Sequence, residues 1–354
     1  MRRLLSVYYA MKSARAAGAV LLLWASLACN MERSRPALGD ASSIVVAATD
    51  SLWLATGDSI LSALQPRIFT VRDEKTFELT HVSPERVEWR DLRQIRQILA
   101  IGEPDDPWME PVLDGDIPAS LPAIVERQNV WARNQLVTAI VLPPGGGASH
   151  VLAVLDSVGE QLDFRYREYA RSRMYVSGVD SALQDTLART AGFSVLLPDV
   201  YRYERLDSGF VFRNHSEMSG TLLRTILVTW RPGAPAELGV PLATAWRDSI
   251  GDLAYDPAQE VETARFETRA LASGPGPGFE VQGVWTSEDT SWPAAGPFIT
   301  RLVICPEQNR TYLLDAWLFA PGKAKYEYMI QLNTILDSFR CGSAPPNPAR
   351  PAAP

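Results

Sequence analysis

Hydrophobic residues in this sequence occur more often in short continuous runs than at the spacing of a helix face. Continuous apolar runs at 44–49 and 97–102 are typical of buried strands, and residues 76–82 alternate as a half-buried strand does. The same reasoning predicts further strands at 129–144, 193–198, 201–206, 210–214, 222–230, 265–272, 279–287, 297–307 and 311–322.

Apolar residues spaced three and four apart predict fewer helices. They are expected at 60–64, 84–96, 149–175, 180–190, 241–254 and 323–340. Strands outnumber helices and several are separated only by turns, so we predict an α+β fold. We expect two lobes, 41–177 and 178–341, each a mainly antiparallel sheet with helices packed on its faces. The Pro-rich segment 103–127 is predicted to be a long surface loop.

The amino terminus has the pattern of a secretory signal peptide. Four basic residues precede an uncharged apolar run at 16–28, which has 13 residues. A membrane-spanning helix needs about 20 such residues, so the run is too short to span a bilayer. We therefore interpret residues 1–28 as a cleaved export signal.

The residues that end this run, Ser26-Leu27-Ala28-Cys29, resemble the lipobox of bacterial lipoproteins. The resemblance implies that Cys29 is acylated and becomes the first mature residue, with 29–40 as a tether. The expected partner is then the membrane itself, through a lipid anchor, and non-acidic Asn30 favours the periplasmic face of the outer membrane. The alternative is an ordinary signal peptide that has a cysteine nearby.

Charge and cysteine content limit the partners and the compartment. Removing residues 1–28 takes away four positive charges, so the net charge falls from −7 to −11, which argues against nucleic acid as a partner. Cys305 and Cys341 remain as an even pair, and we expect a disulfide between them in an oxidising compartment. Two unpaired thiols are the alternative. The tail at 342–354 is rich in proline, and we expect it to be disordered.

Catalytic and cofactor motifs are incomplete in the sequence. Gly57-Asp58-Ser59 is similar to the start of the Gly-Asp-Ser-Leu hydrolases, whose serine needs a histidine base from an Asp-x-x-His motif. The three histidines, His81, His150 and His215, do not lie in such a motif. Asp58 or Ser59 is therefore expected to cap a helix. Nucleotide loops and metal-binding motifs are missing from the sequence as well, so we expect no cofactor and no metal.

Two tryptophans lie in Pro-rich segments where an exposed indole would be unusual. Trp108 and Trp292 are the candidate contact surface for a glycan, a peptide or a partner protein of the envelope. The alternative is that both rings pack onto the core.

Several segments together resemble a family of uncharacterised bacterial lipoproteins, the domain of unknown function forty-eight thirty-seven. They are Asp50–Ile60, 128–137 (QNVWARNQLV), 283–285 (GVW), 296–301 (GPFITR), 309–321 and 325–336, and the resemblance extends over about 41–340. The last half is also similar in topology to the α/β/α sandwich of photosystem extrinsic proteins and a Ran-binding import factor, through Leu197–Tyr201 and the helix end at 337–339. The family has no established activity.

These observations favour a lipid-anchored envelope protein that acts without catalysis, as a binding or assembly module. One alternative is a serine hydrolase that uses Ser59. Another is a periplasmic carrier of a small hydrophobic ligand.

Overall fold

The structure is a computed structural model of the 354-residue chain. It describes residues 35–207, 209–215, 222–272, 274–289 and 291–342. The predicted signal peptide, the lipidation site and residues 343–354 of the predicted tail lie outside the described residues.

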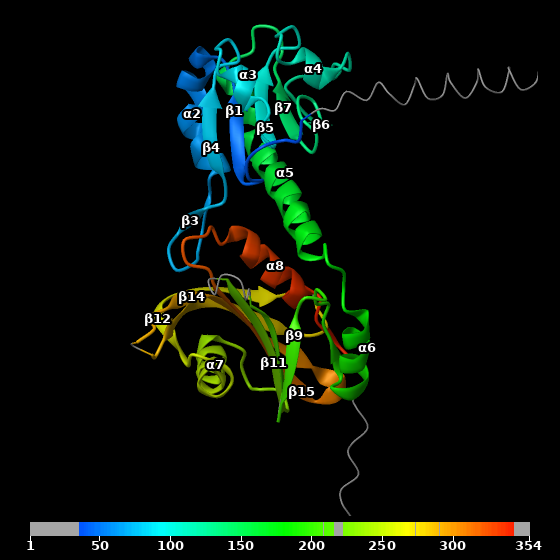
Figure 1. Cartoon of the computed structure of the whole chain (residues 1–354), viewed down its shortest axis with the longest axis vertical. Coiled ribbons are helices and arrows are strands. Elements are labelled where there is room, and N and C mark those ends of the chain that lie inside the picture. Colours follow the sequence, from blue (N-terminus) through cyan, green and yellow to red (C-terminus); the bar gives the residue numbers. More distant parts are fainter. Residues whose placement is uncertain (1–34, 208, 216–221, 273, 290, 343–354) are drawn as a thin grey trace, which may run out of the picture. The chain divides into compact units, whose positions relative to one another are not determined.

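The chain divides into two compact units (Figure 1). Within the described residues, the first unit consists of 35–61 and 78–158, and the second of 62–77 and 159–342. The sequence division near residue 177 differs from this one because contacts assign the later part of a long helix, and a hairpin at 67–75, to the second unit. Each unit contains one large sheet.

The first unit contains a five-stranded sheet with the order β4-β1-β5-β7-β6. Its strands are β1 (Ser43–Ala47), β4 (Glu78–Val82), β5 (Gln97–Gly102), β6 (Ala123–Gln128) and β7 (Leu136–Val141). Only the β6–β7 pair is antiparallel, and the other three pairs are parallel. The expectation of a mainly antiparallel sheet is therefore wrong for this unit. Parallel neighbouring strands need long crossover connections, and helices of this unit lie in such connections.

In the described part of the first unit, four helices begin: α2 (Asp50–Leu64), α3 (Trp89–Leu92), α4 (Glu110–Leu113) and α5 (Ala148–Met174). Buried residues of α3 and α4 pack with one face of the sheet, in a cluster that includes Trp89, Met109 and Val112. The opposite face is buried too, since Val46 and Leu99 are 0% exposed. Among the described residues, none of the helices combines the length and the apolar character needed to cross a membrane.

The prediction that Asp58 or Ser59 caps a helix is wrong, because both residues lie inside α2. The helix begins at Asp50, where the Oγ1 atom of Thr49 accepts a hydrogen bond from the Leu52 N–H at 3.3 Å. Asp58 and Ser59 therefore lie in the helix interior, on its exposed side. At Gly57 a Cβ atom would lie only 2.9 Å from the Trp53 ring, so this position of the helix favours glycine. The glycine therefore has a packing role inside α2 and does not mark the start of a helix.

Three further local predictions are corrected in this unit. The segment 103–127 contains α4 and most of β6, so it is not a plain surface loop. The strand expected at 129–144 is limited to β7, because 129–135 form a turn in which Asn129 and Asn134 have φ angles of 60° and 64°. The helix expected at 84–96 is one short segment, α3.

The second unit is built on a seven-stranded sheet with the order β12-β13-β14-β15-β11-β10-β9, antiparallel throughout. The strands are β9 (Arg202–Leu206), β10 (Gly209–His215), β11 (Leu223–Pro232), β12 (Gln259–Leu271), β13 (Gly278–Ser287), β14 (Ala295–Cys305) and β15 (Arg310–Phe319). The small pair β2 (Arg67–Ile68) and β3 (Glu74–Lys75) forms a hairpin in the same unit. Helices accompany both large sheets, so the predicted α+β class is confirmed.

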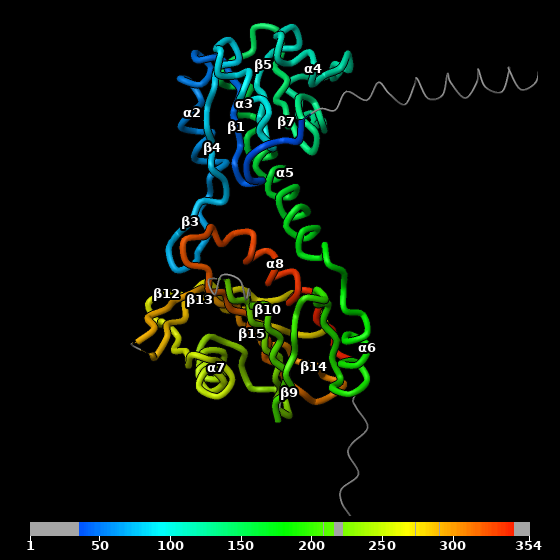
Figure 2. Tube along the Cα trace, in the orientation of Figure 1, coloured from blue at the N-terminus to red at the C-terminus, as the bar shows by residue number. Residues whose placement is uncertain are grey.

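Helices cover this sheet on both faces. The helices are α6 (Ser181–Thr190), α7 (Val240–Ala254) and α8 (Tyr326–Asp337), and α7 and α8 lie on opposite sides of the sheet (Figure 2). Alternate residues of β14 therefore enter different cores. Ile299 and Val303 pack in the cluster with α8, and Phe298 and Leu302 pack in the cluster with α7.

A disulfide between Cys305 and Cys341 fixes the segment after α8, as the sequence predicts. The two Cα atoms are 5.9 Å apart, and Cys341 belongs to β16 (Arg340–Cys341), which pairs with β8 (Phe193–Ser194). The bond therefore ties the end of β14 to the chain that follows α8. For a separation of 36 residues, loop closure in the unfolded chain corresponds to a stabilisation of about 4 kcal/mol.

Candidate functional site

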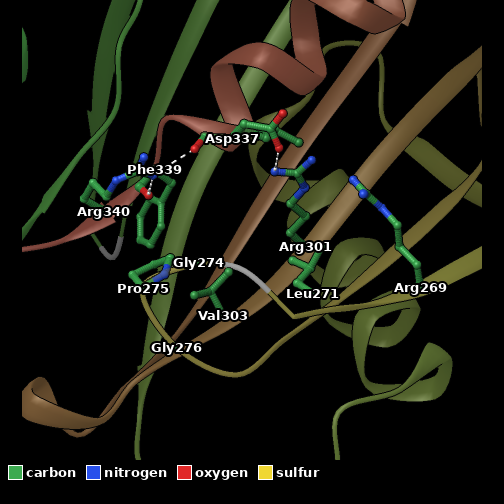
Figure 3. Close-up of a pocket in the computed structure, with 11 residues that line it drawn as sticks. Arg269, Leu271, Gly274, Pro275, Gly276, Arg301, Val303, Asp337, Phe339 and Arg340 are labelled. Carbon is green, nitrogen blue, oxygen red and sulfur yellow. Dashed lines mark hydrogen bonds and ion pairs between the residues drawn. The ribbon is translucent and has the colours of Figure 1, made fainter. Parts of the chain in front are cut away.

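A cavity of about 580 Å³ opens between the carboxyl end of α8 and strands β12 and β14 in the second unit (Figure 3). We call it the arginine cavity, after Arg269, Arg301 and Arg340, which line it. The other lining residues are Leu271, Gly274, Pro275, Gly276, Val303, Leu336, Asp337 and Phe339.

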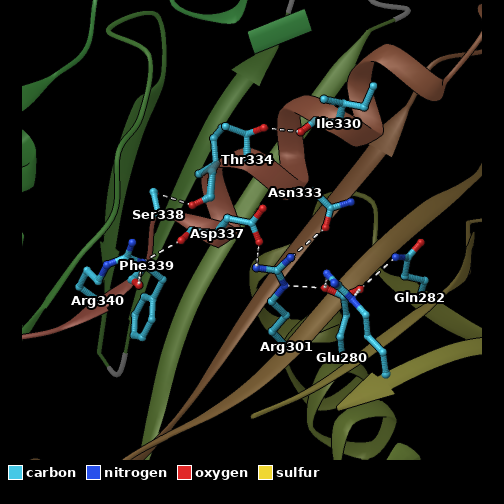
Figure 4. A network of polar contacts seen from close by, with 12 residues as sticks. Glu280, Gln282, Arg301, Ile330, Asn333, Thr334, Asp337, Ser338, Phe339 and Arg340 are labelled. Carbon is cyan, nitrogen blue, oxygen red and sulfur yellow. Dashed lines mark hydrogen bonds and ion pairs between the residues drawn. The ribbon is translucent and has the colours of Figure 1, made fainter. Parts of the chain in front are cut away.

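A buried carboxylate beside the cavity holds two of these arginines together (Figure 4). The side chain of Glu280 is 1% exposed. Its Oε1 and Oε2 atoms accept hydrogen bonds from the Nε and Nη2 groups of Arg269 at 2.7 and 2.8 Å. Its Oε2 atom also accepts from the Nε group of Arg301 at 2.6 Å. The two guanidinium groups are therefore fixed next to each other, although their charges repel.

Sheet register produces this arrangement. Glu280 lies directly opposite Arg269 on β12 and directly opposite Arg301 on β14, so the three side chains form a row across three strands. Opposite charges in such cross-strand positions attract, whereas like charges directly opposite would repel. The central position of the acid thus explains why both neighbours can be arginine.

The carboxylate of Glu280 is ionised at neutral pH. Burial by itself raises its pKa, but the hydrogen bond from Arg269 and the charge of Arg301 outweigh that effect, so the pKa is lowered overall. A buried charge is tolerated only when it is paired in this way. Glu280 is therefore part of a fixed ionic network.

The remaining charged groups of the network, Asp337 and Arg340, lie at the end of α8 and just after it. Arg301, whose side chain is 5% exposed, contacts Asp337 Oδ1 through Nη1 at 2.8 Å, and its Nη2 donates to Asn333 Oδ1 at 2.9 Å. Arg340 donates from Nη1 to the backbone carbonyls of Asp337 and Phe339 at 2.8 and 2.7 Å. A basic side chain that binds the last carbonyls of a helix is a favourable cap.

The glycine-containing loop between β12 and β13 borders the cavity. A Cβ atom on Gly276 would lie 2.0 Å from the carbonyl oxygen of Ile304, whereas one on Gly274 would have no neighbour nearer than 4.0 Å. The backbone at Gly276 therefore passes directly over β14, and the hydrogen bond from the Ile304 N–H to the Pro277 carbonyl at 2.9 Å holds it there. This contact fixes one wall of the arginine cavity.

A second cavity, of about 380 Å³, lies in the first unit at the carboxyl ends of β1, β5 and β7. Open parallel sheets often bind ligands at this edge. Its lining combines the starts of α2 and α5 with the carboxylates of Glu103 and Asp106. Helix amino termini favour anions and carboxylates favour cations, so the two features oppose each other. Three arginines line the arginine cavity, and the carboxylates of Asp337 and the neighbouring Glu280 offset two of their charges. The arginine cavity therefore keeps a net positive charge, and it is the stronger candidate site.

The structure changes the interpretation of the two tryptophans. Trp108 is 7% exposed and donates from Nε1 to the Ile101 carbonyl at 3.2 Å, so it belongs to the core. It is buried because the chain folds back through α4 onto the sheet. Trp292 is partly buried and packs on Phe319, with ring centroids 5.0 Å apart. For Trp108 the alternative of a ring packed onto the core is therefore the correct one.

The three histidines have contacts that do not involve Ser59. His81 bonds to the Ala48 carbonyl at 2.9 Å, and its ring stacks on Trp53. His150 accepts from the Gly147 N–H at 3.3 Å, and His215 lies 3.1 Å from the hydroxyl of Thr225.

None of the charged residues of the arginine cavity was predicted from the sequence. A usable signal was present, because Glu280 and Arg301 interrupt strands that are otherwise largely apolar. A charged residue in such a strand must find a partner. The register that pairs these two residues was not deducible from the pattern alone.

The fold and the cavity thus define an α+β protein whose second unit offers a polar cavity with an excess of arginine. The family model described as Domain of unknown function (DUF4837) matches residues 180–338. The expected resemblance is confirmed over this range, which includes Glu280, Arg301 and Asp337, whereas the motif at 50–60 lies outside it. No curated protein matches the chain.

Several solved structures resemble part of the fold. The Ran-binding protein Mog1p of Saccharomyces cerevisiae is 11% identical over 43% of this chain and 91% of its own, with a TM-score of 0.29. LpqN of Mycobacterium tuberculosis, involved in cell envelope biogenesis, is 12% identical over 42% of this chain and 82% of its own, with a TM-score of 0.26. A protein of Bacteroides thetaiotaomicron is 13% identical over 43% of this chain and 45% of its own, with a TM-score of 0.24. The expected weak likeness to the import factor is confirmed, and these values are too low to bear on function.

The lowered pKa of Glu280 predicts how stability depends on pH. The ionised carboxylate stabilises the folded state fully above its ordinary pKa of 4.5, and this contribution is lost as the pH falls through the lowered value. Removing one partner of a buried pair costs about 3 kcal/mol, so we expect Glu280→Gln to lower the free energy of unfolding by that amount at neutral pH. Urea denaturation followed by tryptophan fluorescence measures the difference, which should shrink in acid.

Glu267→Gln is the control, because Glu267 lies on β12 and its ion pair with Arg265 is exposed. Exposed pairs contribute about 0–1 kcal/mol, so this variant should stay close to the wild type. A Glu280→Gln difference that grows as the pH falls would contradict the proposed network.

Proposed function

We propose that the protein is a lipid-anchored, extracytoplasmic binding module of the bacterial cell envelope, and that it binds a small ligand in the arginine cavity without catalysis. The observation that carries the proposal is the cavity itself. Its volume of about 580 Å³ falls in the range of ligand sites in proteins. Ligand sites also contain a small number of precisely placed polar groups, and the charged side chains that line this cavity can serve as such groups.

The walls of the arginine cavity are held in place before any ligand arrives. Two of the walls come from β12 and β14, which both pair with β13. The disulfide ties down the segment that carries Arg340, and Gly276 fixes the loop over β14. A preformed site loses less conformational entropy on binding, which favours affinity.

The compartment in this proposal depends on the amino terminus and on the cysteines. The pattern of residues 1–28 and the lipobox-like Ser26–Cys29 support export and acylation. The bond between Cys305 and Cys341 fits an oxidising compartment, where disulfides persist. We place the protein at the outer membrane, facing the periplasm.

The two alternative functions receive less support from the structure. Ser59 lies on an exposed helix face, and each of the three histidines contacts other groups. A carrier of a hydrophobic ligand needs a mainly apolar cavity, whereas four charged side chains line this one. Binding of a polar ligand is the function that the geometry favours.

The first test is the retention of a ligand. We expect native mass spectrometry of the full mature protein, purified from its own host, to show an added small-molecule mass. Leu271→Trp should abolish that mass, because Leu271 lines the cavity and an indole would fill it. Leu253→Trp is the matched control, since Leu253 is 87% exposed on α7, on the other face of the sheet.

Absence of any bound molecule would contradict the proposed binding role. So would a bound molecule that Leu271→Trp retains as fully as the wild type does.

The second test concerns the anchor. We expect metabolic labelling with palmitate to mark the wild-type protein and not Cys29→Ser, because only Cys29 follows the lipobox-like residues. The double variant Cys305→Ser, Cys341→Ser should keep the label, since those cysteines form the disulfide. Label that persists in Cys29→Ser would remove the anchor from the proposal.

A further inference from the structure

We propose that the arginine cavity binds an oxyanion, a phosphate or carboxylate group, which displaces the side chain of Asp337 from Arg301 and lies between Arg301 and Arg340. This inference rests on the proposed function and names the ligand class. Asp337 then acts as an internal substitute for the ligand in the empty cavity.

The position of Asp337 makes it displaceable. It is the last residue of α8, where the negative end of the helix dipole disfavours a carboxylate. Its side chain is 62% exposed, so water already screens its contact with Arg301. The carboxylate is therefore weakly held compared with Glu280, whose side chain is 1% exposed between two arginines.

Arg301 is suited to receive the incoming group. Its Nε group is committed to Glu280 and its Nη2 group to Asn333, and both partners hold the guanidinium plane in place. Only the Nη1 group faces the exposed Asp337 carboxylate, at 2.8 Å. When Asp337 moves away, this N–H group becomes a directed, charged donor for another oxyanion.

Arg340 supplies the second donor. Its Nη1 group binds the backbone carbonyl of Asp337 at 2.8 Å, so both guanidinium groups lie at hydrogen-bond distance from the same residue. Within the described part of the chain, its Nε and Nη2 groups make no hydrogen bond. Arg340 can therefore bind an oxyanion without releasing the carbonyls that it caps.

The charge balance sets the sign of the ligand. Arg269, Arg301 and Arg340 carry three positive charges, and Glu280 and Asp337 carry two negative ones. Moving Asp337 out towards water increases the positive potential in the cavity. A ligand that carries an oxyanion restores the balance, whereas a cationic ligand would be repelled by the arginines.

The experiment is isothermal titration calorimetry of the mature protein with inorganic phosphate and with citrate. We expect Asp337→Asn to bind about fivefold more tightly than the wild type, because the competing carboxylate is gone. Arg340→Gln should bind at least about tenfold more weakly, because a charged donor is lost. Both residues are exposed, so both variants should fold.

Matched controls separate these local effects from net charge. Asp185→Asn and Arg189→Gln make the same charge changes on exposed positions of α6 that do not line the cavity. They should leave the affinity within about twofold of the wild type.

A lipid source of the phosphate is tested in a second arm. The test is flotation with phosphatidylcholine vesicles that contain phosphatidic acid, compared with phosphatidylcholine alone. If a lipid headgroup is the ligand, the vesicles with phosphatidic acid should bind Asp337→Asn more tightly than the wild type and Arg340→Gln more weakly. Binding of the free anions alone identifies a soluble source.

Weaker binding by Asp337→Asn would overturn the inference, because Asp337 would then be part of the recognition. Lack of binding to every phosphate and carboxylate probe would overturn it too. If a native ligand is still lost in Leu271→Trp, the proposed binding function survives that failure, and only the ligand class is wrong.

Discussion

One buried carboxylate organises the candidate site of this protein. Glu280 lies between Arg269 and Arg301 on neighbouring strands and binds both, so two positive charges stay side by side where they would otherwise separate. The cost of burying an acid is offset only while both arginines remain paired with it. The row of three side chains therefore depends on the strand register and, in turn, keeps the edge of the sheet in a single arrangement.

The covalent and packing features around this row act on the same region. The disulfide holds the chain after α8 against the end of β14, and the close approach of Gly276 to Ile304 holds the neighbouring loop. Phe339, which is 2% exposed, anchors the turn between Asp337 and Arg340 in the core. Charged groups are thereby presented on a rigid frame, which binding sites and catalytic sites both require.

Much of the fold was predictable because local pattern decides it. The strand at 97–102 agrees with β5, and the helix expected at 149–175 agrees with α5 within one residue at each end. Pairing of Cys305 with Cys341 followed from counting cysteines. The predictions failed where tertiary contacts override pattern. Parallel pairing in the first sheet is a property of the connections, and the long strand expected at 129–144 is broken by Asn129 and Asn134 at positive φ.

The arginine cavity was beyond prediction for a related reason. Glu280, Arg301 and Arg340 are far apart in sequence, and only register and the position of α8 bring their charges together.

Replacement of Asp337 by an oxyanion would be visible in a crystal structure of the mature protein with tungstate. We expect anomalous density at hydrogen-bond distance from Arg301 and Arg340, with Asp337 turned away. An unoccupied cavity with the Arg301–Asp337 contact intact would contradict it.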